Sequence, residues 1–366
     1  MKEEKMNGEH RPSNTEHPTS NAGGDESDAL KKKDRVILMD HGGGGQRSDL
    51  LIRERILPLI GNPLLNRLGD GAVFDIDQTR LAFSTDAYVV DPIFFPGGSI
   101  GRLAVCGTVN DLSMCGARPL YLSSSLIIEE GFSLDDLERI LDDMDRAANE
   151  AGVRIVTGDT KVVPRGAADR IFITTSGIGV VDGIPFTEKT VEPGDRIIVS
   201  GTLADHGMAI LSARKALGVT TSIVSDTAPL NHLTAAMLES GADIKFLRDP
   251  TRGGLASVLH EMSRDAGVAV RLHESAIPMK PEVSALCRLL GFDPLYVANE
   301  GKLVAVVAEK DADNLLRTMN HHDLGRDAAI IGEVINPGPA AVSLRTAIGG
   351  DRIIPWLSGE QLPRIC

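Results

Sequence analysis

Short β-branched runs alternate with amphipathic helical stretches from residue 35 onward, and this alternation limits the folds open to the chain. Apolar residues at a period of two predict strands, whereas apolar residues at helical spacing predict helices. In the first half we expect strands at 72–76, 79–90, 119–130, 153–163 and 170–181, and helices at 48–62, 98–117 and 133–152. Ser48 or Asp49 is expected near the N-cap of the first helix. Such a pattern is typical of an α/β or α+β fold.

A Pro-Gly turn in the sequence EPGDRIIVSG separates this first half from a second half of similar size. A new apolar strand follows the turn. We expect helices at 206–218, at 229–240 and after the sequence RDPTRGG, and strands at 268–274 and 301–308. The sequence therefore predicts a two-domain α/β (α+β) architecture, with domains at residues 35–185 and 186–350.

The two ends of the chain differ from these domains. Residues 1–34 are polar and have almost no large apolar side chains, so we expect a disordered extension. Residues 351–366 are interrupted by proline and are predicted to form a mobile tail, with Trp356 anchoring its root. The tail ends in Cys366, and a thiol at a free end suits a reactive group that has to travel.

The charge balance excludes some classes of function. The chain has 38 Lys and Arg against 51 Asp and Glu, a net charge of −13, which argues against a nucleic-acid partner. A nucleotide remains possible, because carboxylates hold phosphates through Mg²⁺. The sequence shows no apolar signal segment, no run near the roughly 18 apolar residues of a membrane span, and no paired cysteine spacing. We expect a soluble cytoplasmic protein with reduced thiols and no membrane partner.

Acidic and amide residues recur at the ends of predicted elements, beside glycine or other small residues. They are Asp70, Asp86, Asn110, Asp111, Asp159, Asp249 and Glu300, and Lys161 follows closely on Asp159. Any one of them taken alone is more often a cap or turn residue, and Lys161 could form a salt bridge with Asp159. Asp111 differs, because a carboxylate on a small, apolar helix face is costly unless it is paired. Carboxylates that face one site repel one another, so a cluster of them implies Mg²⁺ shared with phosphates.

Two glycine-rich segments complete the candidate site. The sequence HGGGG at residues 41–45 is costly to order unless a ligand or another backbone approaches it closely. The sequence TRGG at residues 251–254 precedes a helix and could present backbone N–H groups to an anion. The remaining cysteines and three lone histidines are expected to have packing or capping roles: Cys106, Cys115, Cys287, His41, His206 and His260.

Eight stretches together resemble one family. They are HGGGG, LAFSTDAYVVDPIFFPGGSIG, GTVNDLSMCGARPLYLS, IVTGDTKVVPRGAADRIFITTSGIG, VSGTLADHG, RDPTRGG, ANEGKLV and the terminal PRIC. From about residue 35 to the end, their order and spacing are similar to those of the HypE family of hydrogenase maturation factors. That family belongs to the superfamily of aminoimidazole ribonucleotide (AIR) synthetase and selenophosphate synthetase. The polar extension of about 34 residues departs from the family.

The resemblance implies an N-terminal mixed-sheet domain for ATP binding and homodimerisation, and a C-terminal α/β domain. It implies ATP and Mg²⁺ as cofactors. A HypF-like carbamoyltransferase would load the terminal cysteine, and the protein would then use ATP to dehydrate the thiocarboxamide to a thiocyanate. A HypC–HypD-like complex would accept the cyano group as an iron ligand of nickel–iron hydrogenase.

Carried over position by position, the resemblance also assigns roles to single residues. Mg²⁺ would be bound by Asp70, Asp86, Asp111 and Asp249; ATP by Gly43, Gly44, Asn110, Asp159, Lys161 and Gly253; catalysis would use Cys366, Lys161 and Glu300. Loss of a phosphorylated amide oxygen requires a base for the N–H proton, and the sequence leaves open whether Lys161 or Glu300 is that base. In an inward pose of the tail, Pro363 would stiffen the segment and Arg364 would dock on carboxylates.

Two other readings stay open at this point. One is another small-molecule kinase of the same superfamily, although residues 35–50 contain no reactive cysteine of the kind expected for a selenophosphate synthetase. The other is a non-catalytic scaffold whose tail docks into a partner. Clustered carboxylates disfavour the scaffold, because a scaffold has no need of them.

Overall fold

The computed structural model describes residues 36–183, 186, 190–214, 218, 221–335, 340–359, 362 and 364–366. The chain divides into two compact units, residues 1–38 and 39–366, and the helices and strands of the described residues belong to the second unit. The predicted extension at 1–34, and Pro363 in the tail, lie outside the described residues. Within the described ranges, no helix combines the length and the apolar character needed to cross a membrane.

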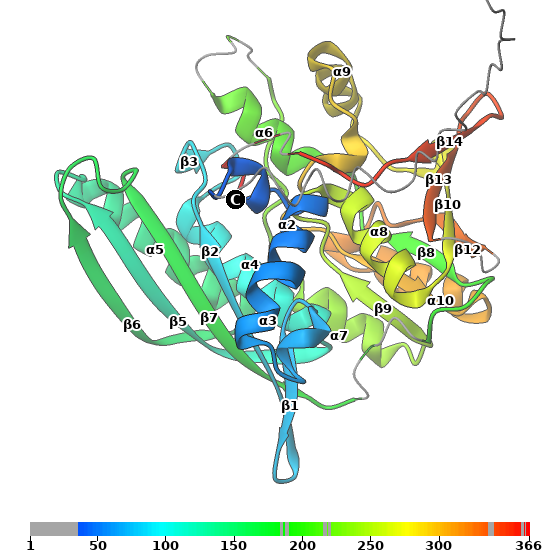
Figure 1. Ribbon diagram of the computed structural model, residues 1–366, viewed down its shortest axis with the longest axis horizontal. Helices are drawn as coiled ribbons and strands as arrows, with labels where there is room; N and C mark the ends of the chain where they lie inside the picture. The colour runs from blue at the N-terminus through cyan, green and yellow to red at the C-terminus, as the bar shows by residue number, and fades with distance from the viewer. Residues whose placement is uncertain are drawn as a thin grey trace, which may run out of the picture. The chain divides into compact units, whose positions relative to one another are not determined.

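A five-stranded mixed sheet with the strand order β1-β2-β7-β5-β6 forms the first half (Figure 1). Its strands are β1 (Ala72–Ile76), β2 (Thr79–Tyr88), β5 (Ala117–Glu129), β6 (Arg154–Val163) and β7 (Ile171–Val181). Strands β5 and β6 are parallel, and the other neighbours are antiparallel. Helices α4 (Ile100–Met114) and α5 (Leu134–Ala151) pack on one face. The opposite face, called the outer face below, keeps Phe83, Tyr121 and Ile127 exposed.

Local sequence explains both helices on this sheet. The hydroxyl of Ser99 caps α4 by accepting the N–H of Arg102, and that of Ser133 caps α5 by accepting the N–H of Asp136. Gly152 ends α5 in the left-handed conformation at φ 71°. The buried residues of α5 recur at helical spacing: Ile140, Met144, Ala147, Ala148 and Ala151.

The helix predicted at 48–62 is present but segmented. It consists of α2 (Gln46–Leu51), a π-helical turn (Ile52–Ile56) and α3 (Leu57–Ile60), after a short 3₁₀ turn (Met39–Gly42) and before another (Leu65–Arg67). Pro58 lacks the N–H needed for an ordinary helical bond, which accounts for the irregular turn that precedes it. The helix begins earlier than predicted, so Ser48 and Asp49 lie within its first turn. The cap is Gly45, and the hydroxyl of Ser48 instead accepts the N–H of Gly44.

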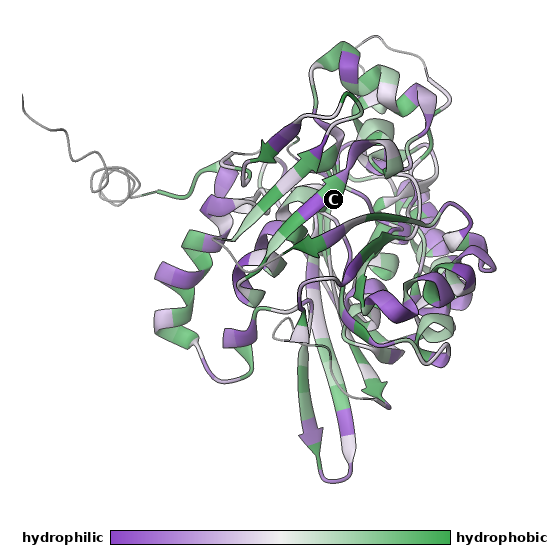
Figure 2. Ribbon diagram, turned by 90° about the vertical axis from the view of Figure 1, so that its right-hand side faces the viewer, coloured by the Kyte–Doolittle hydropathy of each residue, from purple (hydrophilic) through white to green (hydrophobic). Residues whose placement is uncertain are grey.

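The second half contains a seven-stranded sheet with the order β14-β13-β10-β12-β8-β11-β9. Its strands are β8 (Arg196–Val199), β9 (Ile244–Arg248), β10 (Ala269–His273), β11 (Val304–Val307), β12 (Ala329–Ile335), β13 (Ala341–Arg345) and β14 (Asp351–Ile354). The helices are α6 (Asp205–Ala213), α7 (Asn231–Glu239), α8 (Gly254–Ala266), α9 (Pro281–Leu290) and α10 (Glu309–Asn320). Strands β8 and β11 are almost wholly buried, and hydrophobic runs in the strands contrast with the mixed helix surfaces (Figure 2).

Short elements connect these parts. They are β3 (Phe94–Phe95), β4 (Gly98–Ser99) and the 3₁₀ turns Glu274–Ala276, Pro294–Tyr296 and Asp323–Gly325. Two halves with mixed sheets and packed helices confirm the predicted α/β (α+β) fold class. The boundary predicted at residue 185 stays a prediction.

The expectation that core elements end at residue 350 is wrong. Residues 351–354 form β14, an edge strand that pairs with β13 through Ile354 and Val342. The ring of Trp356 then stacks on His260, with ring centroids 5.9 Å apart, and the guanidinium of Arg264 lies 4.9 Å from its centre. Trp356 therefore anchors the segment, as predicted. The mobility of the residues beyond it stays a prediction.

Candidate active site

Three carboxylates from distant parts of the sequence meet where the two sheets approach each other. Asp70 precedes β1, Asp111 lies in the last turn of α4, and Asp249 follows β9. Each offers a carboxylate oxygen, and these oxygens lie within 4.8 Å of one another. Ser84 on β2 ties the group together, because its hydroxyl contacts Asp111 Oδ2 at 2.5 Å and the carbonyl of Asp70 at 2.8 Å.

This aspartate cluster fits a hard divalent cation. All its donors are carboxylate oxygens, the ligand type that Mg²⁺ prefers, and its members repel one another. Burial, and then the charges of Asp249, Asp86 and Asp70, raise the pKa of Asp111 well above its usual range. Burial and Asp86 raise the pKa of Asp249 to about 7. A cation held by Asp70, Asp111 and Asp249 would remove this repulsion.

Asp86 is predicted as a fourth ligand, but the structure places it beside the cluster rather than in it. It lies on β2, two residues from Ser84 and on the same face, and its carboxylate accepts the hydroxyl of Tyr88 at 3.1 Å. Burial raises the pKa of Asp86, while Arg252 opposes that effect. Asp86 therefore connects the aspartate cluster to a second group of residues around Cys366.

That second group lines a small cavity of about 20 Å³. The cavity is bounded by Asp86, Ala87, Tyr88, Gly107, Asp249, Thr251, Arg252, Glu300 and Cys366. The fold thus brings together two of the predicted catalytic residues. Glu300 comes from the loop that precedes β11, and Cys366 comes from the end of the chain. Glycine is required at position 107, because a Cβ atom there would lie 2.2 Å from the hydroxyl oxygen of Tyr88.

The protonation of this cavity follows from burial. Glu300 is 3% exposed, and burial, with help from Asp249 and Asp226, raises its pKa well above the usual range. Its Oε1 is buried without a hydrogen-bond partner among the described residues. Burial likewise raises the pKa of the Cys366 thiol, against the influence of Arg252. In this pose Cys366 is a neutral thiol and a weak nucleophile.

Main-chain hydrogen bonds hold the end of the tail in place. The N–H of Val89 donates to the main-chain oxygen of Cys366 at 3.0 Å, and the N–H of Asp91 donates to the carbonyl of Arg364 at 3.1 Å. The tail thereby pairs with the chain that continues from β2. Arg364 forms an ion pair with Asp169, which confirms the predicted docking on a carboxylate, and Arg214 donates to its carbonyl at 3.1 Å.

Arg252 and Tyr88 were not predicted as site residues. Arg252 lines the cavity, and the thiolate form of Cys366 would raise the pKa of its guanidinium most, followed by Asp86 and Glu300. The sequence carried a signal for each. Arg252 lies inside the TRGG segment, and Tyr88 follows Ser84 and Asp86 in the period of two that lines one face of β2.

Asp159 and Lys161 are not brought to this cavity within one chain. The pairing register places Asp159 in one row with Ser125, Thr174 and Ala87. Paired residues in a row point to the same face of the sheet, whereas consecutive residues in a strand point to opposite faces. Asp159 therefore lies on the outer face, whereas Asp86 lies on the inner face. The two residues are also separated by three strand spacings, ~14 Å. Both side chains are exposed and paired with each other, with Lys161 Nζ 2.7 Å from Asp159 Oδ2.

Asn110 joins α4 to the second half of the chain, and its predicted place beside a nucleotide stays a prediction. Its side chain is fully buried. The amide nitrogen donates to the carbonyls of Ala228 and Glu300, each at 3.2 Å, and the amide oxygen accepts the N–H of Leu230 at 2.8 Å. These three hydrogen bonds join α4 to the second half of the chain.

The predicted glycines lie together near the tail. Gly43, Arg252 and Gly253 line a second small cavity with Leu362 and Ile365. The sequence HGGGG is ordered by close backbone approach, as expected for such a run. A Cβ atom on Gly44 would lie 2.5 Å from the carbonyl oxygen of Arg252, and one on Gly45 would lie 2.3 Å from that of Leu357.

Fold and site together define a protein related to AIR synthase. The family described as "AIR synthase related protein, N-terminal domain" matches residues 68–181, and its C-terminal counterpart matches residues 192–344. A relative from Cupriavidus necator, "Carbamoyl dehydratase HypE", is 54% identical over 339 residues, which span 92% of this chain and 97% of the relative. This chain belongs to the carbamoyl dehydratase HypE family.

Solved structures of that family share the fold. The HypE chain in "Crystal structure of HypE-HypF complex" is 47% identical with a TM-score of 0.80, over 84% of this chain and 99% of that one. The chain in "Crystal Structure of Hydrogenase Maturation Protein HypE in complex with ATP" is 47% identical with a TM-score of 0.76, over 90% and 100%. The family prediction made from the motifs is confirmed.

Proposed function

We propose that this protein uses ATP to dehydrate an S-carbamoyl group on its own Cys366 to a thiocyanate, which supplies a cyano ligand for the iron of nickel–iron hydrogenase. The position of Cys366 carries the proposal. The thiol at the end of the chain shares a cavity with Glu300 and Arg252, and Asp249 joins that cavity to the aspartate cluster. The ATP complex of the related HypE supports ATP as the substrate.

The chemistry converts an amide oxygen into a leaving group. Transfer of the terminal phosphoryl group of ATP to the carbamoyl oxygen releases ADP, and loss of phosphate with the N–H protons leaves the carbon–nitrogen triple bond. The net change is the loss of one water from the carbamoyl group. Mg²⁺ bound by Asp70, Asp111 and Asp249 would neutralise charge on the phosphates.

Glu300 is the base that the geometry favours. Within one chain it lines the same cavity as Cys366, whereas Lys161 lies on the outer face. A carboxylate with a raised pKa is a stronger base than an ordinary one, and Arg252 opposes the rise and so favours its charged form. Arg252 is also placed to stabilise negative charge that develops on the carbamoyl oxygen.

The tail would alternate between the inward pose seen here and an exposed pose. The raised pKa of Cys366 disfavours loading in the inward pose, because the thiolate is the nucleophile that a carbamoyl donor requires. We propose that a HypF-like carbamoyltransferase loads the exposed tail, and that a HypC–HypD-like complex later accepts the cyano group. The complex of a related HypE with HypF supports the first of these partners.

We also propose a homodimer formed through the outer face of the first sheet. Phe83, Tyr121 and Ile127 are 39–47% exposed on this face, which also carries Asp159 and Lys161. A second copy would bury the apolar residues. Any catalytic role of Lys161 would then be exerted on the neighbouring copy.

The four free cysteines are in keeping with the cytoplasm, where we place the protein.

The deciding experiment is the mass of the C-terminal peptide after incubation with a carbamoyl donor system, with and without Mg-ATP. We expect a carbamoyl adduct on Cys366 that loses one water only when ATP is present, and no adduct in Cys366→Ala. An adduct that persists with ATP would contradict the dehydratase and favour a carrier or scaffold. No adduct on the wild-type tail would contradict the assignment of Cys366.

A further inference from the structure

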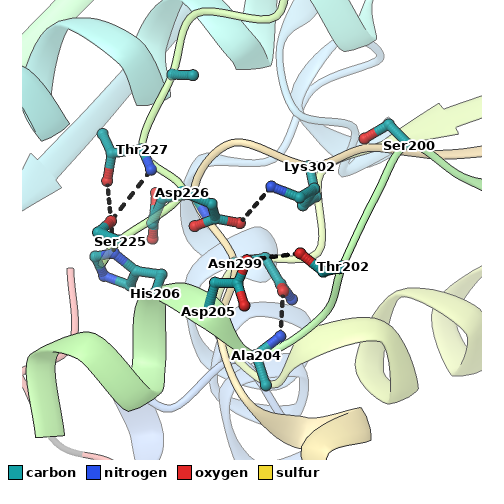
Figure 3. Close-up of polar contacts among 12 residues, drawn as sticks. Ser200, Thr202, Ala204, Asp205, His206, Ser225, Asp226, Thr227, Asn299 and Lys302 are labelled. Atoms are coloured by element: carbon teal, nitrogen blue, oxygen red, sulfur yellow. Dashed lines mark hydrogen bonds and ion pairs between the residues drawn. The ribbon is translucent and has the colours of Figure 1, made fainter. Parts of the chain in front are cut away.

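One three-residue segment, Ser225–Thr227, bonds the ring of His206 through Ser225 (Figure 3) and the backbone N–H of Glu300 through Asp226. It approaches the tail through His206 at the start of α6, and Glu300 through Asp226. None of these three residues, nor His206, was predicted to have a functional role. The inference below rests on the proposed function and concerns how its two reacting groups are positioned.

His206 holds the peptide group that precedes Cys366. Its side chain is fully buried, and its Nε2 lies 2.7 Å from the carbonyl oxygen of Ile365. A carbonyl only accepts hydrogen bonds, so Nε2 must carry the proton. The Nδ1 atom lies 2.8 Å from the Ser225 hydroxyl, which must therefore donate to it when the ring is neutral. The tail bond thus fixes the tautomer of the ring.

Ser225 and Thr227 fix the other end of this arrangement. The Ser225 oxygen accepts the N–H of Thr227 at 3.1 Å and lies 2.6 Å from the Thr227 hydroxyl. Because the single hydroxyl proton of Ser225 is directed to His206, the Thr227 hydroxyl donates to Ser225. The hydrogen bonds run in one direction, from Thr227 through Ser225 and His206 to the tail. The edge of the His206 ring also packs on Phe95, with centroids 5.6 Å apart.

Asp226 holds the backbone of Glu300. Its Oδ1 accepts the N–H of Glu300 at 3.1 Å, and its Oδ2 pairs with Lys302 Nζ at 3.2 Å. Burial alone would raise the pKa of Asp226, but Lys302 and His206 outweigh it and lower that pKa, so the carboxylate is charged. A Cβ atom on Gly301 would lie 1.8 Å from the carbonyl oxygen of Asp226, so the two segments touch backbone to backbone.

The first half of the chain fixes the same segment from the other side. The N–H of Ser225 donates to the carbonyl of Pro96 at 2.8 Å, and Arg102 on α4 donates to the carbonyl of Thr227 at 3.1 Å. The segment is therefore held rigidly between the two halves of the chain. A rigid support of this kind can set the position of groups that it touches on both sides.

We propose that Ser225–Thr227 is a positioning unit, in which His206 latches the inward tail by the carbonyl of Ile365 while Asp226 sets the place of Glu300. The unit fixes the sulfur-bound group relative to the carboxyl group that takes its proton. His206 and Asp226 are positioning residues, because they act through Ile365 and Glu300 rather than on the reacting atoms.

Two substitutions of His206 separate this role from simple packing. Glutamine places an amide nitrogen near the position of Nε2 and can still donate to Ile365, whereas asparagine reaches only as far as Nδ1 and retains the contact with Ser225 alone. Both keep a polar side chain in the core. The latch therefore predicts opposite behaviour for His206→Gln and His206→Asn, whereas a packing role predicts similar behaviour for both.

The first measurement uses the unloaded full-length protein and does not depend on the proposed reaction. The rate of N-ethylmaleimide addition to Cys366 is followed by peptide mass, which separates it from Cys106, Cys115 and Cys287. We expect His206→Asn to react about tenfold faster than the wild type, the effect of losing one buried hydrogen bond, and His206→Gln to stay within about twofold. Equal rates for Asn and wild type would overturn the latch.

The second measurement is single-turnover dehydration of the carbamoyl-loaded variants with Mg-ATP. We expect a loss of about tenfold for His206→Asn and recovery of most of the rate for His206→Gln, with carbamoyl loading at least as fast as in the wild type in both. If both variants lose the rate equally, the positioning role is wrong. If the wild type itself loses no water, the proposed function fails, while the maleimide rates still decide the latch. Should His206→Asn fail to fold, Ser225→Ala removes the donor that supports the latch and serves in its place.

Discussion

Asp226 and Glu300 are buried side by side, yet the pKa of Asp226 is lowered and the pKa of Glu300 is raised. Burial raises the pKa of both, but Asp226 pairs with Lys302 and accepts a backbone N–H, which lowers its pKa overall. Glu300 faces Asp249 and Asp226 instead, and only Arg252 opposes the rise. The neighbours therefore make Asp226 a fixed anion and Glu300 a group able to exchange a proton.

Glu300→Gln should abolish most of the dehydration and leave loading intact. Glutamine keeps the shape of the side chain but cannot accept the N–H proton, and removal of a general base lowers rates by about 10²–10⁴-fold. The measurement is the rate of water loss from carbamoyl-loaded protein with Mg-ATP. Glu282→Gln, on an exposed position in the first turn of α9, is the matched control and should react like the wild type. An unchanged rate in Glu300→Gln would exclude Glu300 as the base.

The buried state of His206 should make folding stability fall in mild acid. Burial lowers the pKa of His206 below 6.5, although Asp226 and the carbonyl of Ile365 oppose this. As the pH falls through 6.5, the unfolded chain therefore binds a proton that the folded chain does not. The free energy of unfolding then drops by up to about 1.4 kcal/mol per pH unit.

His206→Gln removes this contribution, because glutamine does not titrate. Urea unfolding of both proteins from pH 8 to pH 5 isolates the effect, since contributions from other histidines cancel in the difference. The wild type should lose more stability than the variant below pH 6.5. Parallel curves for the two proteins would show that His206 binds a proton equally well in the folded state.

At the scale of elements, the site depends on loops that approach one another at backbone distance. The chain that leads into β11 crosses the 225–227 segment at Gly301, and β2 passes α4 at Gly107. Any side chain at position 301 or 107 would push the two neighbouring elements apart by at least the width of a methyl group. Glycine at position 301 therefore sets the distance between the Glu300 loop and the 225–227 segment, and glycine at position 107 sets the distance between β2 and α4.

Gly301→Ala should destabilise the protein and misplace Glu300. The added Cβ would lie 1.8 Å from the carbonyl oxygen of Asp226, so the backbone has to move, at a cost of about 1 to 3 kcal/mol. Gly183→Ala is the control. Its Cβ would face open space among the described residues, and we expect a change within about 0.5 kcal/mol. Equal urea midpoints for the two variants would contradict the crowding inferred at Gly301.

At the scale of the whole molecule, the first sheet separates two groups of predicted site residues, which lie on its opposite faces. One face of the first sheet presents Asp86 to the cavity, and the other presents Asp159 and Lys161 away from it. A single copy therefore contains Cys366 and Glu300 but not Lys161 at its cavity. In the proposed homodimer through the outer face, Lys161 would contribute to the site of the neighbouring copy.

Mixed dimers test this arrangement. Lys161→Ala and Cys366→Ser should each be inactive alone, because the first lacks the lysine and the second lacks the thiol. After mixing and exchange of subunits, a dimer with one copy of each would offer an intact Lys161 to an intact tail, and dehydration should return to about a quarter to a half of the wild-type level. No recovery in dimers verified by sedimentation would place Lys161 outside the neighbouring site.

Much of the fold could be predicted from the sequence, because local patterns carry it. Ser133 and Gly152 mark the ends of α5, and the period of two in β2 places Ser84, Asp86 and Tyr88 on one face. The segmented helix at 46–60 and the strand β14 were not foreseen. The first depends on Pro58 within a helical pattern, and the second depends on the edge offered by β13.

The sequence by itself determined the alternation of elements, the candidate acidic residues, the family and the candidate cysteine Cys366. Only the tertiary structure decided which of these residues meet. Asp70, Asp111 and Asp249 converge because α4 and two sheets pack together, whereas the register of β5 with β6 turns Lys161 to the opposite face. Sequence spacing fixes the residues on one element, but distances between elements follow from packing and strand pairing, which join residues remote in the chain.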